Sequence, residues 1–286
     1  MIVSGRPDHG ARLGQCPTAG LRCYAGPVKT TFTSAVIHID GITLHAEWRG
    51  APAPASLVLV FLHDGLGSLE ALRTFPDRLA EATGLAAFAY DRWGYGRSDA
   101  RESFPLDFME EEAARLPRVL AAVGIADYIL VGHSAGAVIA LMHAATNPPG
   151  LRAAVIISAR VFGEQTSVDQ VEHFLRLAED DAIPDWMVRF HGARARQLMG
   201  DWASAWRDIF ERGWDIRQLV AAIRGPLCVI QGEDDDFGRP AQLEAIAHAV
   251  PHAESALLSG CAHFPHLDKP EQVVRLVATF IRRHAG

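Results

Sequence analysis

Three stretches of the sequence hold the residue types that nucleophilic catalysis needs. Residues 132–136 read GHSAG, a G-x-S-x-G motif, residues 232–238 read GEDDDFG, and two histidines, His263 and His266, follow near the C-terminus. A serine hydroxyl is a weak nucleophile until a neighbouring base takes its proton, and that base needs an acid to hold its tautomer. The chain order of serine, acids and histidines therefore predicts acyl-transfer chemistry on Ser134.

The segments on either side of Ser134 predict how its hydroxyl is presented. The apolar run DYILVG, residues 127–132, is typical of a buried strand, and AGAVIALMHAAT, residues 135–146, is typical of a helix. A serine on such a sharp turn is held above the carboxyl edge of the sheet, and flanking glycines are needed because strand and helix come close together. The helix N-terminus favours negative charge there, and the backbone N–H of Ala135 is the first expected oxyanion donor.

The rest of the chain alternates between strand and helix patterns from Ala35 onwards. A hairpin is expected around Asp40-Gly41, and a helix is expected over residues 68–84, where apolar residues recur at helical spacing before a glycine. The expected buried strands are SLVLVFL, LAAFAY, DYILVG, RAAVIIS, PLCVIQG and SALLS. This alternation predicts an open, mostly parallel α/β sheet covered by helices on both faces.

A helical stretch interrupts this alternation. Residues 161–222 show helical patterns without a strand candidate, and they hold four of the six tryptophans in the chain. The predicted domain organisation is therefore an N-terminal extension at residues 1–34, an α/β core at residues 35–160 and 223–286, and an inserted helical cap at residues 161–222.

Composition and charge exclude several classes of function. The formal net charge of −7 argues against a nucleic-acid partner, whose phosphates call for clustered Lys and Arg. The apolar runs are far shorter than the ~20 residues that span a bilayer, and the N-terminus lacks the apolar segment of a secretory signal. Four cysteines, at spacings that match neither a disulfide framework nor a zinc site, predict reduced thiols. We expect a cytoplasmic monomer or homodimer that uses no metal or organic cofactor and does not bind membranes.

Four stretches together resemble the α/β-hydrolase family: FLHDGLGS, YDRWGYGRSD, GHSAG, and the pair GEDDDFG and GCAHFPHLDKPE. The resemblance covers about residues 35–286 and implies an eight-stranded sheet with a cap after the sixth core strand. The family's acid ends a G-x-x-D turn, which implies Asp235, so that Glu233, Asp234 and Asp236 are expected to be solvated. The family's histidine precedes a proline-glutamate helix start, which implies His263 and leaves His266 a packing or capping role.

The same resemblance implies the second oxyanion donor. In the family, a His-Gly pair follows the strand that corresponds to LVLVFL, and the donor comes just after the glycine, which implies the N–H of Gly65, with Leu66 as the alternative. Here Asp64 replaces the family's glycine. Because a carboxylate beside an oxyanion would oppose the reaction, we expect Asp64 to be held by a partner such as Arg92 or Ser68.

The surroundings of the expected site predict the kind of substrate. Few positive charges in the cap favour a small, neutral, apolar ester or lactone. Residues 91–99 are expected to form a structural loop in which only Trp93 borders the pocket, and most aromatic side chains of the cap are expected to pack it onto the core. The residues expected to contact substrate are His63, Asp64, Trp93, His133, Trp186, Phe190, Trp206 and Phe264.

Two alternatives stay open, and a third is disfavoured. A hydrolase of carbon–carbon bonds in ring-cleavage products uses the same three side chains, and only substrate trials separate it from an esterase. A non-catalytic binding protein could also retain those side chains. Epoxide and haloalkane hydrolases carry an aspartate where this chain has Ser134, which disfavours them.

Overall fold

One eight-stranded sheet organises the molecule. The computed structural model describes residues 32–53 and 56–284. The strands are β1 (Thr33–Ile39), β2 (Ile42–Arg49), β3 (Val58–Leu62), β4 (Ala86–Tyr90), β5 (Tyr128–His133), β6 (Leu151–Ile157), β7 (Leu227–Gly232) and β8 (Glu254–Leu258). Their order in the sheet is β1-β2-β4-β3-β5-β6-β7-β8. Only the pairings of β1 with β2 and of β2 with β4 are antiparallel, which confirms the predicted mostly parallel sheet.

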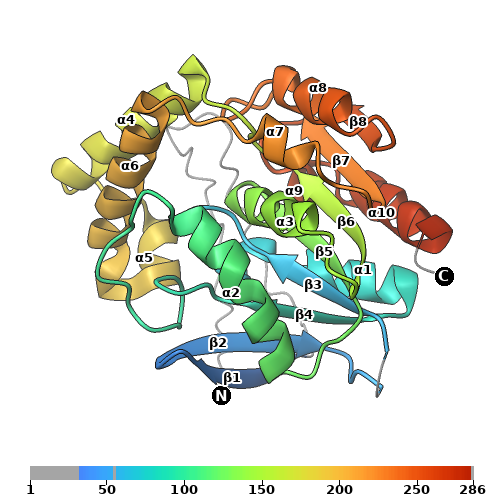
Figure 1. Cartoon of the computed structure of the whole chain (residues 1–286). Coiled ribbons are helices and arrows are strands. Elements are labelled where there is room, and N and C mark those ends of the chain that lie inside the picture. The colour runs from blue at the N-terminus through green and yellow to red at the C-terminus, as the bar shows by residue number, and fades with distance from the viewer. Residues whose placement is uncertain (1–31, 54–55, 285–286) are drawn as a thin grey trace, which may run out of the picture.

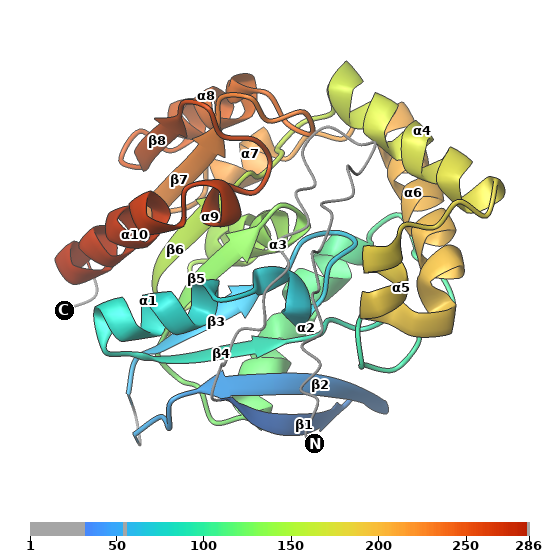
Figure 2. The ribbon, with the colours of Figure 1, turned by 180° about the vertical axis from the view of Figure 1, so that it is seen from behind.

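Helices cover both faces of this sheet (Figures 1 and 2). The helices on one face are α2 (Phe108–Ala122), α3 (Ala135–Ala145), α7 (Arg217–Val220) and α8 (Pro240–Ala249). The other face carries α1 (Phe75–Thr83) and α10 (Pro270–His284), which contact each other. In β3, Val58, Val60 and Leu62 pack into the apolar layer under α2, α3, α7 and α8. Leu59 and Phe61 pack into the apolar layer under α1 and α10. A strand buried on both faces has no position left for a polar side chain, which explains the continuous apolar run.

The hairpin at the start of the sheet follows its predicted turn. Ile39 of β1 pairs with Ile42 of β2, so the connection is the two residues Asp40 and Gly41. Their φ angles of 51° and 77° are both positive, as this tight turn requires. The hairpin prediction is confirmed.

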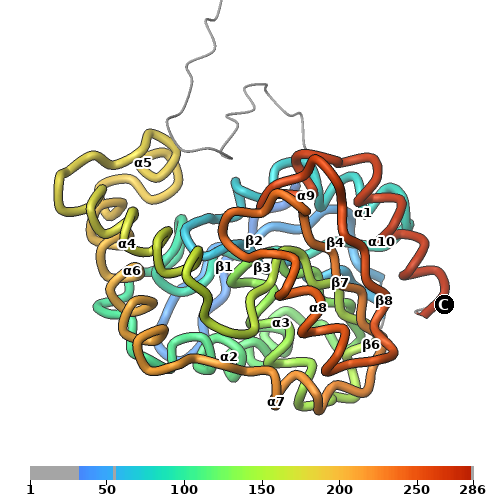
Figure 3. The backbone as a smooth tube through the Cα atoms, turned by 90° about the horizontal axis from the view of Figure 1, so that it is seen from above, coloured from blue at the N-terminus to red at the C-terminus, as the bar shows by residue number. Residues whose placement is uncertain are grey.

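The segment between β6 and β7 is helical. It contains α4 (Gln165–Glu179), α5 (Asp185–His191), the short 3₁₀ helix η2 (Gly192–Arg194), α6 (Ala195–Glu211) and α7. We call α4, α5, η2 and α6 the inserted helices; Figure 3 shows α4, α5 and α6 on the opposite side of the molecule from α10. Helix α7 instead contacts α3 and α8 of the core, with Val220 buried. We therefore propose a shorter cap than residues 161–222, made of the inserted helices alone.

Some local boundaries differ from the expectation. The helix expected over residues 68–84 is divided into the 3₁₀ helix η1 (Leu69–Leu72) and α1, because Arg73 takes a positive φ of 52°. Pro76, in the first turn of α1, cannot donate a backbone hydrogen bond and disfavours helix before it. The short helix α9 (Pro265–Asp268) was not anticipated.

The N-terminal expectations fall mostly outside the described residues. Residues 1–31 of the expected extension are not described, nor are Cys16 and Cys23, whereas β1 begins at Thr33. Cys228 and Cys261 are buried and unpaired. Within the described part of the chain, no helix has the length and hydropathy needed to cross a membrane.

Candidate active site

Ser134 stands on a strained turn between β5 and α3. Its φ of 53° and ψ of −117° are unusual for a residue with a side chain, and strain of this kind collects at functional sites. The Ser134 N–H donates to the carbonyl of Ile157 in β6 at 2.9 Å, which fixes the turn against the next strand. The hydroxyl is therefore presented at the carboxyl edge of the sheet, where α3 begins.

The two glycines of the motif allow this close approach. A Cβ on Gly132 would lie 2.4 Å from the carbonyl oxygen of Gly136, and a Cβ on Gly136 would lie 2.2 Å from that of Leu62 in β3. Backbone atoms cannot yield as a flexible side chain can, so any larger residue would force strand and helix apart. The expected need for small residues here is confirmed.

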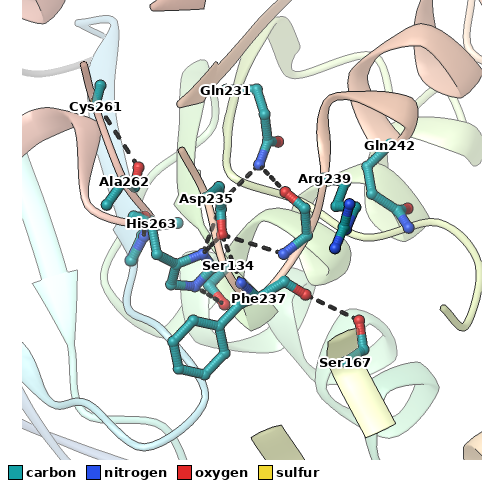
Figure 4. A network of polar contacts seen from close by, with 12 residues as sticks. Ser134, Ser167, Gln231, Asp235, Phe237, Arg239, Gln242, Cys261, Ala262 and His263 are labelled. Atoms are coloured by element: carbon teal, nitrogen blue, oxygen red, sulfur yellow. Dashed lines mark hydrogen bonds and ion pairs between the residues drawn. The ribbon is translucent and has the colours of Figure 1, made fainter. Parts of the chain in front are cut away.

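Three predicted residues form one chain of hydrogen bonds (Figure 4). The Nε2 atom of His263 lies 2.9 Å from the Oγ atom of Ser134, and its Nδ1 atom lies 2.9 Å from both carboxylate oxygens of Asp235. The side chain of Asp235 is fully buried and that of His263 is only 5% exposed. The structure thus brings together a hydroxyl, an imidazole and a carboxylate that follow three different strands.

The loop after β7, residues 233–239, which we call the acid loop, places Asp235 differently from the other three acids. Its carboxylate accepts hydrogen bonds from the backbone N–H groups of Phe237 and Gly238, at 2.8 and 3.1 Å, and from the side chain of Gln231. Glu233 and Asp234 are exposed as expected. Asp236 departs from the expectation because it is half-buried, and burial raises the pKa of its carboxyl.

Neutral rings surround His263. Phe237 stacks on its imidazole with ring centroids 4.5 Å apart, and His133 donates from Nε2 to the His263 carbonyl at 2.8 Å. Burial, and then the neighbouring histidines, lower the pKa of His133 well below its usual value; burial lowers that of His266 to about 3. These two rings therefore add no positive charge beside His263 at neutral pH.

A pocket opens over Ser134 between the core and the inserted helices. The residues that line it are Asp64, Gly65, Leu66, Ala71, Arg73, Ser134, Arg160, Phe174, Trp186, Arg189, Phe190, Trp202, Phe237, His263, Phe264, Leu267 and Asp268. Of the eight residues expected to contact substrate, this lining includes Asp64, Trp186, Phe190 and Phe264. It also includes three arginines, more positive charge than the sequence led us to expect.

Three of the expected contact residues belong to the core and do not line the pocket. His63 is buried and supports the neighbouring loop, accepting from the Arg92 N–H at 3.1 Å through Nε2. Trp93 points elsewhere and donates to the carbonyl of Ala100 at 3.1 Å. His133 is occupied by its bond to the His263 carbonyl. The prediction that these side chains line the pocket was wrong.

Trp206 is the fourth residue that does not line the pocket. Its ring is fully buried and packs against Phe108 of α2, Phe210 and Trp214, with centroids 5.8, 5.1 and 5.3 Å apart. It thus joins α6 to the core, whereas Trp202, one turn earlier on α6, lines the pocket.

The loop after β3 meets both the core and the inserted helices. A Cβ on Gly65 would lie 2.6 Å from the ring of Trp202, so only glycine fits there without movement. The Leu66 carbonyl accepts from Nε2 of His191 in α5 at 2.8 Å. On the facing side, the Ala135 N–H is the first of α3 and has no acceptor within its helix.

Asp64 does not have the expected partners. Arg92 donates from Nη2 to the Asp64 backbone carbonyl at 2.7 Å, and Ser68 accepts from the Glu70 N–H. Among the described residues, neither Arg92 nor Ser68 hydrogen-bonds to the Asp64 carboxylate, which lies against Gly67 at the pocket wall, and burial raises its pKa. The pairing prediction was wrong because the arginine is used to fix the backbone of the loop.

The loop after β4 has the structural character expected of it. The Asp91 carboxylate accepts from the N–H groups of Leu69 and Arg97, at 2.7 and 2.9 Å, and the Ser98 hydroxyl donates to the Asp91 carbonyl at 2.6 Å. These bonds tie the loops after β3 and β4 together. Over the described residues, no group of three or more His, Cys, Asp or Glu side chains is arranged to hold a metal ion.

Sequence reasoning missed three residues beside this site: Gln231, Phe237 and Arg160. Gln231 is a polar residue near the end of an otherwise apolar strand, and Arg160 is a charged residue three positions after β6. Polar side chains at the carboxyl ends of buried strands were the available signal, because ligands of open α/β sheets bind at that edge.

Comparison with known proteins identifies the family of the chain. A family model described as "Alpha/beta hydrolase family" matches residues 59–276. The chain belongs to the alpha/beta hydrolase family. Human serine hydrolase BPHL is 31% identical to this family member over 272 residues, which cover 90% of each chain. The pimeloyl-[acyl-carrier protein] methyl ester esterase of Xanthomonas campestris pv. campestris is 30% identical over 194 residues, covering 58% of this chain and 76% of that protein.

Solved structures of other alpha/beta hydrolases share the architecture. MGS-M2, an alpha/beta hydrolase enzyme from a Medee basin deep-sea metagenome library, has a TM-score of 0.75 at 20% identity, and the match covers 86% of this chain and 97% of that one. At this identity the likeness shows the fold alone.

Proposed function

We propose that this alpha/beta hydrolase cleaves a carboxylic ester or lactone through an acyl-enzyme on Ser134. The observation that carries the proposal is the 2.9 Å contact between Ser134 Oγ and His263 Nε2, together with the hydrogen bond from Nδ1 of the same ring to the buried Asp235 carboxylate. An ionised carboxylate accepts a hydrogen bond from the Nδ1–H group, which keeps that proton on Nδ1 and leaves Nε2 free to accept the proton of the hydroxyl.

In the proposed acylation step, His263 takes the Ser134 proton as Oγ attacks the carbonyl carbon of the substrate. Asp235 stabilises the imidazolium that forms, without itself taking the proton. The imidazolium then protonates the leaving alcohol, or the ring oxygen of a lactone, and the acyl group stays on Ser134.

Deacylation repeats these steps with water as the nucleophile. His263 activates the water, the acid product leaves, and Ser134 regains its proton. In both steps the N–H groups of Ala135 and Gly65 are proposed to hold the oxyanion, with Leu66 as the alternative donor. The N-terminus of α3 adds a favourable dipole.

The lining of the pocket and the relatives support an ester substrate with an apolar portion. Five aromatic side chains from the inserted helices and the acid loop line the pocket: Phe174, Trp186, Phe190, Trp202 and Phe237. Aromatic walls favour apolar ligands. A methyl ester esterase is also among the relatives.

A substrate panel on the wild-type protein and Ser134→Ala tests the proposal. The panel contains 4-nitrophenyl esters, aliphatic lactones and a thioester, and each rate is followed spectrophotometrically or by pH-stat. Loss of the nucleophile should lower kcat by at least ~10⁴-fold on every substrate that the wild type turns over.

Ser158→Ala is the matched control. Ser158 also has a φ of 53°, is only 1% exposed and directly follows the neighbouring strand β6, but it does not line the pocket. This variant should retain most of the wild-type rate. Full turnover by Ser134→Ala, or equal losses in both variants, would remove the basis of the proposed mechanism.

A further inference from the structure

A buried arginine at the pocket lacks a hydrogen-bonding partner within the described part of the chain. Arg160 follows β6, lines the pocket over Ser134 and is only 3% exposed. Among the described residues its guanidinium forms no hydrogen bond and no ion pair, and its Nη1 atom is wholly buried. A guanidinium has five N–H donors, and buried donors without acceptors are costly.

Aromatic packing holds Arg160 but leaves these donors unsatisfied. The guanidinium lies 5.1 Å from the ring centroid of Trp206 and 5.5 Å from that of Phe210, both on α6. The side-chain carbons pass close to Gly238 of the acid loop. Burial lowers the pKa of Arg160 to about 10, so the side chain is still protonated at neutral pH. A ring face attracts the cation but accepts few of its hydrogen bonds.

Two other arginines of this chain have carboxylate partners. The Arg101 side chain is 2% exposed and pairs with Glu112, whose carboxylate is 3.3 Å away. Arg189, which lines the same pocket, is about half-exposed and lies 3.7 Å from Glu70. Arg160 differs from both because no carboxylate of the described residues forms an ion pair with its guanidinium, and an acceptor bound in the pocket would supply the missing partner.

Two further donors in the pocket lining also lack acceptors. The indole Nε1 atoms of Trp186 and Trp202 are buried and have no hydrogen-bond partner among the described residues. Three pocket residues thus have buried N–H groups without a matching oxygen, and a ligand rich in acceptors would satisfy them better than a wholly apolar one.

The order of the strands places Arg160 relative to the reacting bond. Strand β5, which ends before Ser134, lies between β3 and β6. Asp64 and Gly65 follow β3 on one side of the serine, and Arg160 follows β6 on the other. An oxyanion held at Gly65 would therefore leave the opposite end of the substrate near Arg160, about one strand spacing of ~4.8 Å from the serine's strand.

We propose that the substrate of this hydrolase carries a carboxylate, which Arg160 binds on the β6 side of Ser134 while the scissile carbonyl faces the β3 side. The inference rests on the proposed function and names the substrate class for the same site. It replaces the neutral substrate expected from the sequence, because that expectation counted charges in the cap, and Arg160 precedes the inserted helices.

The competing account is that Arg160 only supports the site. Asp235 and Glu164 are near enough to raise the pKa of Arg160 against the effect of burial, so these carboxylates and the guanidinium stabilise one another through space. If that were the whole role, loss of the guanidinium would impair every substrate equally. A carboxylate-binding role instead impairs only substrates that carry the anion.

Two matched substrate pairs separate these accounts. The first pair, 4-nitrophenyl hydrogen glutarate and 4-nitrophenyl pentanoate, differs by a carboxylate on the acyl side. The second, 3-acetoxybenzoate and phenyl acetate, differs by a carboxylate on the alcohol side. For at least one pair, Arg160→Gln should lower kcat/KM for the anionic member about 10- to 100-fold more than for the neutral member.

Variants and a binding measurement keep the test decisive. Arg160→Met keeps an apolar side chain against Trp206, should Arg160→Gln fold poorly. Arg189→Gln removes a pocket arginine that already has a carboxylate partner, and the preference for the anion should survive in it. Titration calorimetry on Ser134→Ala with 3-phenylpropanoate and its amide should show binding of the carboxylate that Arg160→Gln abolishes.

The outcomes distinguish the two proposals. Equal losses on both members of each pair, with no carboxylate binding by calorimetry, would overturn the role of Arg160 and leave the ester hydrolase intact. Turnover by Ser134→Ala would overturn the proposed mechanism, while the calorimetric comparison would still decide whether Arg160 binds a carboxylate.

Discussion

The proposed catalytic residues and the tryptophans of the inserted helices differ in how their polar groups are hydrogen-bonded. On the core side, Ser134, His263 and Asp235 are joined by hydrogen bonds of 2.9 Å, and the carboxylate has further donors in the acid loop. On the side of the inserted helices, Trp186 and Trp202 present rings to the pocket and leave their indole N–H groups without acceptors.

This difference separates the proposed chemistry from the proposed recognition. Groups that move protons must already lie within hydrogen-bond reach, so their order is built into the folded core. Groups that recognise a ligand gain their partners only when it binds, which leaves donors such as the Arg160 guanidinium unsatisfied within the chain. The carboxyl edge of the sheet holds the first set, and its boundary with the inserted helices holds the second.

The largest effect is expected from a substitution at Asp235. Asp235→Asn puts an amide where His263 Nδ1 meets a carboxylate, which favours the wrong imidazole tautomer, and kcat should fall by about 10⁴-fold. Asp234→Asn is the matched control, because Asp234 is exposed one residue earlier and its variant should keep the wild-type rate. Steady-state kinetics on one ester decides this. A greater loss in Asp234→Asn would place the acid one residue away from Asp235.

An intermediate effect is expected at Gly65, where the loop after β3 meets Trp202 of α6. In Gly65→Ala, the new Cβ would meet the Trp202 ring at 2.6 Å, and the shift of the loop should lower kcat about 10- to 100-fold by displacing an oxyanion donor. Adding Trp202→Leu should restore part of the rate. Gly200→Ala, whose Cβ makes an ordinary 3.5 Å contact, is the control. An unchanged kcat in Gly65→Ala would show that Gly65 does not position a donor.

The smallest effect at neutral pH is expected at His191, which links α5 to the loops after β3 and β4. His191 of α5 donates from Nε2 to the Leu66 carbonyl and accepts from the Gly96 N–H at Nδ1, so only the neutral ring makes both bonds. Burial, and then the charge of Arg194, lower its pKa to about 4. The unfolded chain takes up this proton at higher pH than the folded chain, so the stabilisation is present above about pH 6.5 and declines as pH falls towards 4.

Urea unfolding of the wild type and His191→Gln measures how the contribution of His191 to stability changes with pH. Glutamine keeps a donor and an acceptor but does not titrate, so comparison with the variant cancels the contributions of the other buried histidines and carboxyls. From pH 7 to pH 4, the wild type should lose roughly 3 kcal/mol of unfolding free energy relative to the variant. A difference between the two proteins that stays constant over this range would contradict the account of His191.

Residues at the ends of strands were predictable because buried strands are easy to recognise. Short, continuous apolar runs predict where each strand ends, and the carboxyl ends of parallel strands meet at one edge of the sheet. The G-x-x-D register then distinguished Asp235, now seen to be fully buried, from Asp234, which is exposed. Local pattern and fold agree at these positions.

The inserted helices were less predictable because their rotation depends on packing that the pattern does not contain. Trp202 and Trp206 are four residues apart and share one face of α6 by helical spacing, yet only Trp202 lines the pocket. Trp206 is instead buried against Phe108 of α2. The partners of Asp64 and Arg92 likewise depended on the path of one loop, which the sequence does not show.

The most direct test of the central claim is active-site labelling followed by mass spectrometry. A fluorophosphonate reacts only with an activated nucleophile, so the wild type should gain one adduct, located on Ser134 by peptide mapping. Ser134→Ala should gain none, and Asp235→Asn should label far more slowly than Asp234→Asn. A correctly folded wild type that remains unlabelled, or an adduct that persists in Ser134→Ala, would contradict the assignment of Ser134 as the nucleophile.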